Sequence, residues 1–181
     1  MNTYIGLLRG INVGGNNKLP MKELVTLLEG LGLQKVKTYI QSGNVVFQSE
    51  RTDRIALSQE ITAAIKQRYG FAPAILLLDA DELKAAMAAN PFPEGEDNHK
   101  TLHFLFLENT PSNPNLEKLE QLKTETERFQ LIDKVFYLHA PDGIGRSKLA
   151  ANFDKGWNVT VTARNWRTVA TMMEMAADLE K

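Results

Sequence analysis

The stretch TYIGLLRGINVGGNNKLPMKELVTLLEGLGLQKVKTYIQSGNVVFQ, residues 3–48, decides the fold. It opens with a short apolar strand, Thr3–Leu8, and continues into a loop rich in glycine and asparagine. Pro20 suits the first position of a helix, because its fixed φ and missing N–H fit a helix start. Apolar residues then recur at helical spacing, at Met21, Leu24, Val25, Leu28 and Leu31. The segment therefore predicts a strand followed by a helix with one buried face.

The residues that follow predict the rest of a β-α-β-β-α-β unit. Two strands, 36–40 and 44–48, flank a tight turn at 41–44, and a helix over 52–69 leads into a strand over 72–78. Three isoleucines have the spacing of one helix side: Ile55, Ile61 and Ile65. This element order is the split βαβ, or ferredoxin-like, arrangement.

The pattern largely repeats after a segment rich in proline and charge, 91–100, which reads as a linker. We expect an α+β protein with two ferredoxin-like halves, each an antiparallel sheet with flanking helices. The predicted domains are 1–90 and 101–181. The elements expected in the second half are a strand over 101–107, a helix over 115–123, a hairpin of 129–132 and 135–139, a short helix over 149–153, a short strand over 159–161 and a final helix over 163–179.

The composition excludes several kinds of chemistry. None of the 181 residues is cysteine, so disulfides, thiolate metal sites, iron–sulfur clusters and cysteine nucleophiles are ruled out. His99, His103 and His139 form no ligand-spaced cluster, so we expect no metal and no cofactor. A formal net charge of −1 gives no overall attraction to nucleic acid or to an anionic membrane. With no visible signal peptide or membrane-length apolar run, we expect a cytoplasmic protein whose basic sites are local.

The loop Arg9–Lys18 joins a strand to a helix and has two interpretations. Its glycines let backbone amides approach a ligand, and a helix start attracts anions, so phosphate binding is physically reasonable. The loop has no G-x-G-x-x-G pattern, and Asn16 stands where a Walker A loop requires lysine. The alternative is a glycine-shaped connection held by asparagine side chains.

Three further segments have the residue types of a ligand site. The turn Gln41–Asn44 is equally well explained as a hairpin turn. The loop Gly143–Lys148 has two cations and a hydroxyl that suit a phosphate, or is simply a surface loop. Thr162 is a candidate helix N-cap, which would place Arg164 and Asn165 in the first turn. Arginine there opposes the helix dipole and calls for an anion or a carboxylate partner.

The strings LLRGINVGGNNKLPM, TYIQSGNVVF, NPF and TARNWRTV occur in this order, and together they resemble the bacterial domain-of-unknown-function family numbered 1697. The resemblance runs over essentially the whole chain. It implies a two-part α+β protein related to the ferredoxin-like arrangement, and it supplies no mechanism. It also implies that segments 9–18, 41–44 and 164–167 are hallmarks of the family.

These hallmark segments lead to the hypothesis that all three converge on one cleft that binds an anion. The candidate ligand-binding residues are Arg9, Asn12, Gly14, Gly15, Lys18, Gln41, Ser42, Asn44, Arg146, Lys148, Arg164, Asn165 and Arg167.

The function predicted from these segments is binding of a small phosphorylated or nucleotide-like ligand. One alternative is a nucleic-acid-binding module that uses the sheet, with Tyr4, Tyr39 and Phe47 as aromatics, although the RNA-recognition signature is absent. Another is an enzyme acting on a phosphorylated substrate, with Lys18, Ser147 or Lys148 as candidate groups. The sequence names no general base, so it leaves open whether the protein is an enzyme.

Overall fold

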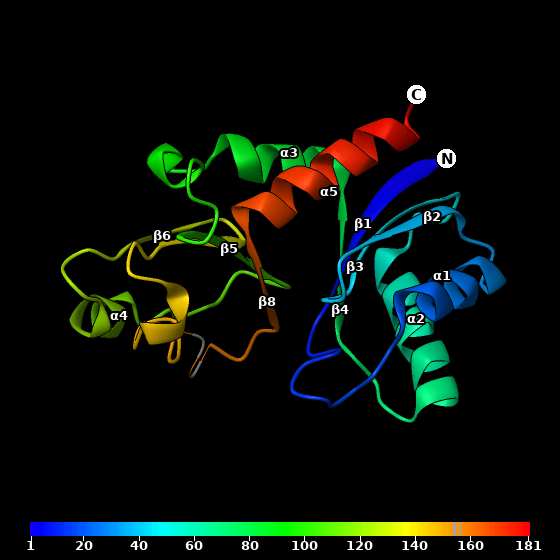
Figure 1. Ribbon diagram of the computed structural model, residues 1–181, viewed down its shortest axis with the longest axis horizontal. Coiled ribbons are helices and arrows are strands. Elements are labelled where there is room, and N and C mark those ends of the chain that lie inside the picture. The colour runs from blue at the N-terminus through cyan, green and yellow to red at the C-terminus, as the bar shows by residue number, and fades with distance from the viewer. Residues whose placement is uncertain (154, 156) are drawn as a thin grey trace. The chain divides into compact units, whose positions relative to one another are not determined.

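The computed structural model describes residues 1–153, 155 and 157–181. Contacts within the chain divide it into two compact units, one of residues 1–85 with 170–181 and the other of residues 86–169. Each unit contains one four-stranded antiparallel sheet (Figure 1). The α+β class and the two halves with repeated strand order are therefore confirmed.

The division between the units passes through two helices, α3 (Ala80–Ala88) and α5 (Trp166–Leu179). The segment expected as a linker, 91–100, lies within the second unit and contains a short 3-10 helix, Pro93–Gly95. Compact units defined by contacts do not show which parts of the chain fold independently, so the predicted domains 1–90 and 101–181 stay a prediction.

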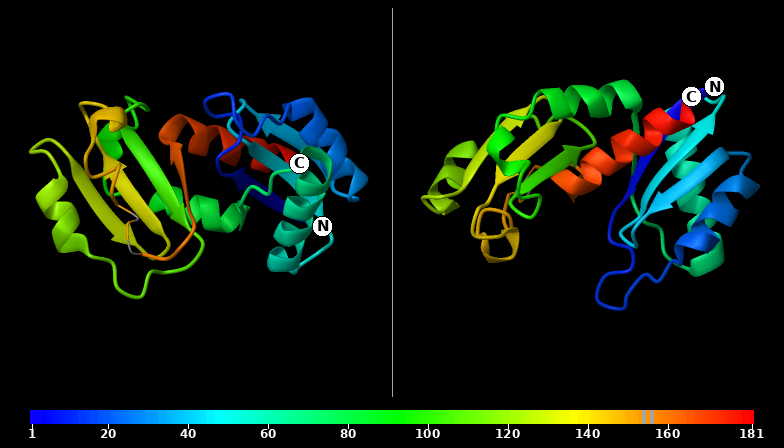
Figure 2. Two further views of the ribbon diagram at one scale, coloured as in Figure 1. Left: turned by 90° about the horizontal axis from the view of Figure 1, so that it is seen from below. Right: turned by 45° about the horizontal axis from the view of Figure 1, so that its top comes forward.

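The first unit has the ferredoxin-like strand order β2-β3-β1-β4. β1 pairs antiparallel with β3 on one side and with β4 on the other, and β3 also pairs with β2. In chain order its elements are β1 (Asn2–Leu8), α1 (Met21–Gly30), β2 (Gln34–Tyr39), β3 (Asn44–Ser49), α2 (Arg54–Tyr69) and β4 (Ile75–Asp79). The two α-β crossovers put α1 and α2 on the same face of the sheet (Figure 2).

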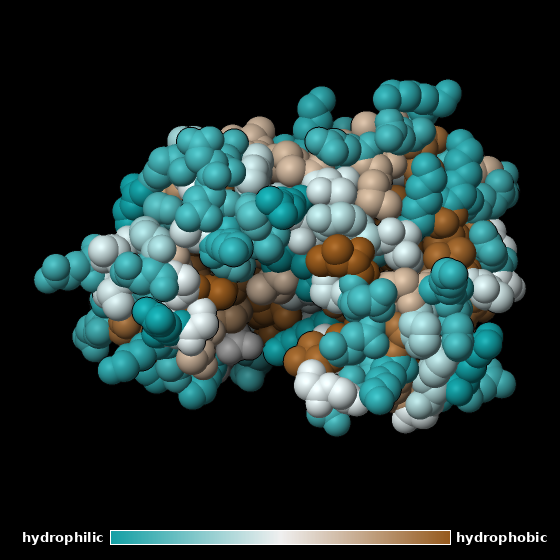
Figure 3. All heavy atoms as spheres, in the orientation of Figure 1, coloured by the Kyte–Doolittle hydropathy of each residue, from teal (hydrophilic) through white to brown (hydrophobic). Residues whose placement is uncertain are grey.

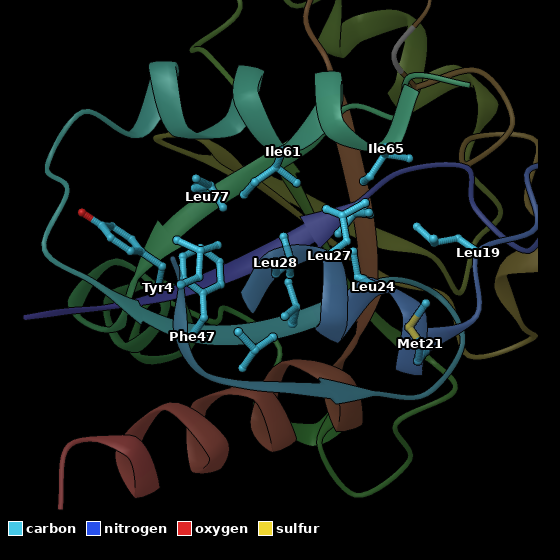
Figure 4. Packing of buried hydrophobic residues seen from close by; sticks show 14 of the residues in the cluster. Tyr4, Leu19, Met21, Leu24, Leu27, Leu28, Phe47, Ile61, Ile65 and Leu77 are labelled. Atoms are coloured by element: carbon cyan, nitrogen blue, oxygen red, sulfur yellow. The ribbon is translucent and has the colours of Figure 1, made fainter. Parts of the chain in front are cut away.

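The core of this unit fills the space between the sheet and the two helices, as Figure 4 shows. Leu24 of α1 and Ile61 of α2 are fully buried there. Tyr4 and Phe47 are register partners on β1 and β3, and their rings pack 5.7 Å apart. These aromatic side chains point toward the helices, so they belong to the hydrophobic core.

Helix α2 begins and ends at residues with clear capping roles. The Asp53 side chain accepts a hydrogen bond from the Ala56 N–H at 2.9 Å, and Gly70 ends the helix in the left-handed conformation at φ 80°. The expectation that Ile55 shares one side of the helix with Ile61 and Ile65 was wrong. Ile55 is 72% exposed, because the helix turns Leu57, Ile61 and Ile65 toward the sheet instead.

Helix α3 starts with a capping box, which the sequence pattern Asp79-x-x-Glu82 is typical of. The Glu82 N–H donates to Asp79 Oδ1 at 2.8 Å, and the Asp79 N–H donates to Glu82 Oε2 at 3.0 Å. The two side chains thus satisfy each other's backbone donors, which fixes where β4 ends and α3 begins.

The C-terminal part of α5 belongs to the first unit and lies on the sheet face opposite α1 and α2 (Figure 4). Two side chains of the sheet donate to the last carbonyl of this helix: Gln48 Nε2 at 2.8 Å and Lys35 Nζ at 3.0 Å from the Leu179 oxygen. The helix end therefore has partners for a carbonyl that lacks one within the helix.

The second unit repeats the strand order of the first, as β6-β7-β5-β8. Its elements are β5 (Leu102–Leu107), α4 (Leu116–Leu122), β6 (Arg128–Ile132), β7 (Val135–His139), a 3-10 helix (Ile144–Arg146) and β8 (Val161–Asn165), followed by α5. The short helix expected over 149–153 was wrong, because these residues form successive turns. Leu149 and Phe153 nevertheless pack into the core of this unit, which explains their apolar spacing.

Candidate functional site

The loop between β1 and α1 is a small hairpin with a glycine turn at its tip. The Asn16 N–H donates to the Val13 carbonyl at 3.0 Å, and the two residues form an isolated β-bridge. Gly14 and Gly15 have φ values of 57° and 79°, the combination of a type I′ turn. Both glycines are thus explained by the turn, which also leaves them exposed at the tip.

Asn12 joins this loop to the turn between β2 and β3. Its Nδ2 donates to the Leu19 carbonyl at 2.9 Å and to the Gln41 carbonyl at 2.8 Å. Its Oδ1 accepts from the Leu19 N–H at 2.8 Å, so one carboxamide makes three hydrogen bonds to the main chain. Asn12 adopts φ 53°, a left-handed conformation that asparagine tolerates better than most residues. The loop is therefore held in one position against the turn.

The turn itself packs closely under the end of β1. The Leu8 N–H donates to the Gly43 carbonyl at 2.8 Å. A Cβ at Gly43 would lie 2.7 Å from Leu8 Cβ and 2.8 Å from Ile11 Cδ1, and its φ is +82°. Asn44 is fully buried, and its Nδ2 donates to the Tyr39 carbonyl at 3.0 Å and to Ser42 Oγ at 2.9 Å. Close packing thus accounts for glycine at position 43, and buried hydrogen bonds account for asparagine at position 44.

The two segments form one surface, residues 9–18 with 40–44, which we call the loop–turn surface. Six of the candidate residues are exposed on it: Arg9, Gly14, Gly15, Lys18, Gln41 and Ser42. In the part of the chain that the structure describes, the Lys18 ammonium takes part in no hydrogen bond or ion pair. The surface contains two cations and no carboxylate, although the chain as a whole has a net charge of −1.

Sequence reasoning missed the conformation of Ile40 on this surface. Ile40 has φ 50° and is 52% exposed. A β-branched residue rarely adopts a left-handed conformation, because its Cβ substituents crowd the neighbouring backbone. No pattern around position 40 indicates this, since the contacts that hold the turn come from Asn12, which is distant in sequence, and from Asn44.

The cations around residue 147 lie in the second unit. Ser147 is buried, and its Oγ accepts a hydrogen bond from the Ala150 N–H at 2.9 Å, which shapes the turns that follow. Arg146 and Lys148 are exposed on either side of it. The hydroxyl thus has a local structural partner, while the two charges face solvent.

The predicted start of the last helix was wrong. Thr162 is not an N-cap but lies in β8, opposite Phe106 of β5, and Arg164 lies in the same strand opposite Phe104. The helix starts at Trp166, and Asn165 Oδ1 accepts from the Thr168 N–H at 2.9 Å. Pairing of 161–165 with β5 therefore moves the cap three residues along, from one good capping residue to another.

The first turn of α5 therefore does not contain Arg164, whose charge was expected to oppose the helix dipole there. Its Nη1 donates to the Ala163 carbonyl at 2.8 Å. Burial lowers the pKa of its guanidinium to about 10, so the side chain keeps its charge at neutral pH. Arg167, one residue into α5, is exposed. Since both arginines and Asn165 precede position 170, they belong to the second unit, and the hypothesis of a single cleft with the loop–turn surface stays a prediction.

The NPF segment has a structural role in the second unit. Phe92 is buried, stacks on His139 with ring centroids 6.1 Å apart, and lies 5.0 Å from the Arg128 guanidinium. Arg128 also forms an ion pair with Glu94. Burial, with the nearby charge of Arg128, lowers the pKa of His139. Asn90 Oδ1 accepts from the Phe92 N–H at 3.0 Å and so positions the ring.

The surroundings of His103 also change the pKa of its side chain. Its Nδ1 is buried and has no hydrogen-bond partner, and burial lowers its pKa to about 4. Among the residues that the structure describes, no group of three or more histidine, aspartate and glutamate side chains is arranged to hold a metal ion.

The fold defines an α+β protein with two ferredoxin-like sheets, and the loop–turn surface lies within its first half. The chain belongs to the family described as "Protein of unknown function (DUF1697)", whose model matches residues 1–137. The matched residues include the whole loop–turn surface, whereas segments 143–148 and 162–167 lie beyond them.

Among solved structures, the chain is similar to a conserved bacterial protein, SP0830 from Streptococcus pneumoniae. The TM-score is 0.71 at 26% sequence identity, over 97% of this chain and 98% of that chain. No curated protein matches the chain.

The face of the molecule seen in Figure 3 is mainly hydrophilic, with apolar side chains in separate places. Within the described ranges, none of the helices has the length and apolar character needed to span a membrane.

Proposed function

We propose that the protein binds a small phosphorylated ligand on the loop–turn surface. The observation that carries the proposal is the Asn12 carboxamide, which holds an exposed cationic loop and an exposed polar turn in one fixed arrangement. Binding to a surface whose groups are already held in place costs less entropy than binding to a mobile loop. The conformational cost is thus largely met before a ligand arrives.

The chemistry of the exposed groups suits phosphate. Lys18 provides an ammonium charge, and Arg9 adds a guanidinium whose planar fork matches two phosphate oxygens. Ser42 has a hydroxyl, Gln41 a carboxamide, and Gly14 and Gly15 have backbone amides at an open hairpin tip. No carboxylate from residues 9–18 or 40–44 opposes an anion there.

Three other hypotheses remain predictions beside this one: the single cleft, the nucleic-acid module and the enzyme. The second-unit residues Arg146, Lys148, Arg164, Asn165 and Arg167 would extend the site in the single-cleft hypothesis, but the proposal does not depend on them. A nucleic-acid module would need exposed aromatic side chains, and two of the expected ones, Tyr4 and Phe47, are core residues. Catalysis by Lys18, Ser147 or Lys148 has no observation in its favour.

The test is a thermal-shift panel of inorganic phosphate, pyrophosphate, sugar phosphates, nucleotides and short RNA and DNA. A ligand at ~100 times its Kd stabilises the folded state by about 2.7 kcal/mol, which raises the Tm of a chain of this size by roughly 5–10 °C. We expect Lys18→Ala to remove most of that shift. Lys84→Ala, an exposed lysine of α3, removes the same charge elsewhere and should leave the shift intact.

Two results would count against the proposal. One is the absence of a shift with every phosphorylated compound. The other is a shift that Lys18→Ala and Lys84→Ala reduce equally, because that would indicate a general effect of charge instead of a site.

A further inference from the structure

The side chain of Ile40 is largely exposed, and its backbone has a left-handed conformation that is unfavourable for a β-branched residue. It has φ 50° with 52% of its surface exposed. The carbonyls on either side of it, those of Tyr39 and Gln41, each accept a hydrogen bond from an asparagine side chain, Asn44 at 3.0 Å and Asn12 at 2.8 Å. The two asparagines therefore hold the peptide groups around Ile40, where glycine or asparagine would adopt the same angle with less strain.

A second exposed aliphatic side chain lies on the same surface. The described residues include five large apolar side chains that are exposed: Met1, Val13, Ile40, Ile55 and Leu116. Val13, 65% exposed, directly follows Asn12, and Ile40 directly precedes Gln41. Since the Asn12 side chain donates to the Gln41 carbonyl, each aliphatic residue is the chain neighbour of one partner in that bond. Two exposed aliphatic side chains thus accompany the cations of the loop–turn surface.

We propose that the phosphorylated ligand is a nucleoside phosphate whose base packs on Ile40 and Val13. This inference rests on the proposed function and adds the chemical class of the ligand. Aliphatic side chains add nothing to the affinity for inorganic phosphate, whereas they can bury the flat apolar face of a base. The exposed carboxamide of Gln41, beside Ile40, has both a donor and an acceptor to pair with the edge of a base.

A nucleotide fits these features better than a phospholipid. A lipid tail needs a continuous apolar groove, whereas the exposed apolar groups here are two side chains, each next in the chain to a polar residue, Asn12 or Gln41. A base has an apolar face and a polar edge, and the loop–turn surface offers exposed groups of each kind in addition to its cations.

The experiment compares inorganic triphosphate with ATP, GTP, CTP and UTP by isothermal titration calorimetry on the full chain. All five probes contain a triphosphate chain, and the nucleotides differ from inorganic triphosphate by the nucleoside esterified to one end, so a gain in affinity comes from the nucleoside. We expect at least one nucleotide to bind roughly tenfold or more tightly than triphosphate. In Ile40→Gly that gain should disappear while the affinity for triphosphate stays unchanged. Ile55→Ala, which trims another exposed isoleucine, should bind like the wild type.

The outcomes separate this inference from the proposed function. If triphosphate binds and no nucleotide binds more tightly, the nucleotide inference is overturned while phosphate binding stands. The inference also fails if nucleotides bind Ile40→Gly as tightly as they bind the wild type. If no probe binds, both proposals fail together. The melting temperature of Ile40→Gly checks its folding, and relief of the left-handed strain should keep it near or above that of the wild type.

Discussion

Substituting Gly43 by alanine should destabilise the first unit through two separable effects. The first is the backbone angle, since φ +82° costs a residue with a Cβ about 1–2 kcal/mol. The second is steric. The new methyl group would lie 2.7 Å from Leu8 Cβ and 2.8 Å from Ile11 Cδ1, and forcing an extra methyl group into a packed core typically costs about 1–3 kcal/mol. We therefore expect the free energy of unfolding to fall by about 2–5 kcal/mol.

The chain contains a matched control for the first effect alone. Gly15 has φ +79°, and a Cβ built there meets no heavy atom within 4 Å. Gly15→Ala thus has the same angle penalty without the clash, and both substitutions restrict the unfolded chain to the same degree. The difference between the two variants isolates the close approach of the turn to β1, and we expect it to be about 1–3 kcal/mol.

Urea denaturation followed by far-UV circular dichroism measures both variants. Equal slopes against urea would show that each variant unfolds the same surface as the wild type, so that the midpoints report stability. If Gly43→Ala and Gly15→Ala lose the same amount, the turn does not press against Leu8 and Ile11, and the close packing described for the loop–turn surface is wrong.

Four other substitutions and the pH dependence of stability test separate parts of the structure. Asn12→Ala should lower the free energy of unfolding by about 2–4 kcal/mol, because three hydrogen bonds are lost. Asn16→Ala, at the exposed hairpin tip, should lower it by under about 0.5 kcal/mol in the same urea assay. The folded state keeps His103 neutral with a pKa of about 4, and the unfolded state takes up a proton near pH 6.5, so stability should fall as the pH drops from about 6.5 to 4. The loss should reach about 3 kcal/mol below that window, and His103→Gln should remove this part of the pH dependence. Arg128→Met should raise the pKa of His139, followed by NMR, because the guanidinium charge adds to burial in lowering it.

Much of the architecture could be predicted from the sequence, because local signals agreed with the tertiary contacts. The capping box of Asp79 and Glu82 sets one boundary through contacts only three residues apart, and Gly70 sets another through its own backbone angle. The strand order of both halves follows from the β-α-β-β pattern and the handedness of its crossovers. Such features need no information from distant residues.

The errors arose where distant residues decide between two reasonable local choices. Thr162 and Asn165 are both good capping residues, and only the pairing of β8 with β5 selects the second. Ile55 and Leu57 are alternative members of the buried side of α2, and the sheet selects Leu57. The left-handed angle of Ile40 accompanies hydrogen bonds from Asn12 and Asn44 to the carbonyls on either side, which no pattern at position 40 reveals.

The candidate site contains two kinds of residue, and only one kind can reveal the ligand. Asn12, Gly43 and Asn44 are accounted for by the contacts that hold the loop against the turn, so their substitution disturbs structure and binding together. Lys18 has no partner among the described residues, and Ile40 contributes an exposed side chain at an unfavourable angle. Because the fold gains little from either, a loss of binding on their substitution, at unchanged stability, would report on the ligand itself.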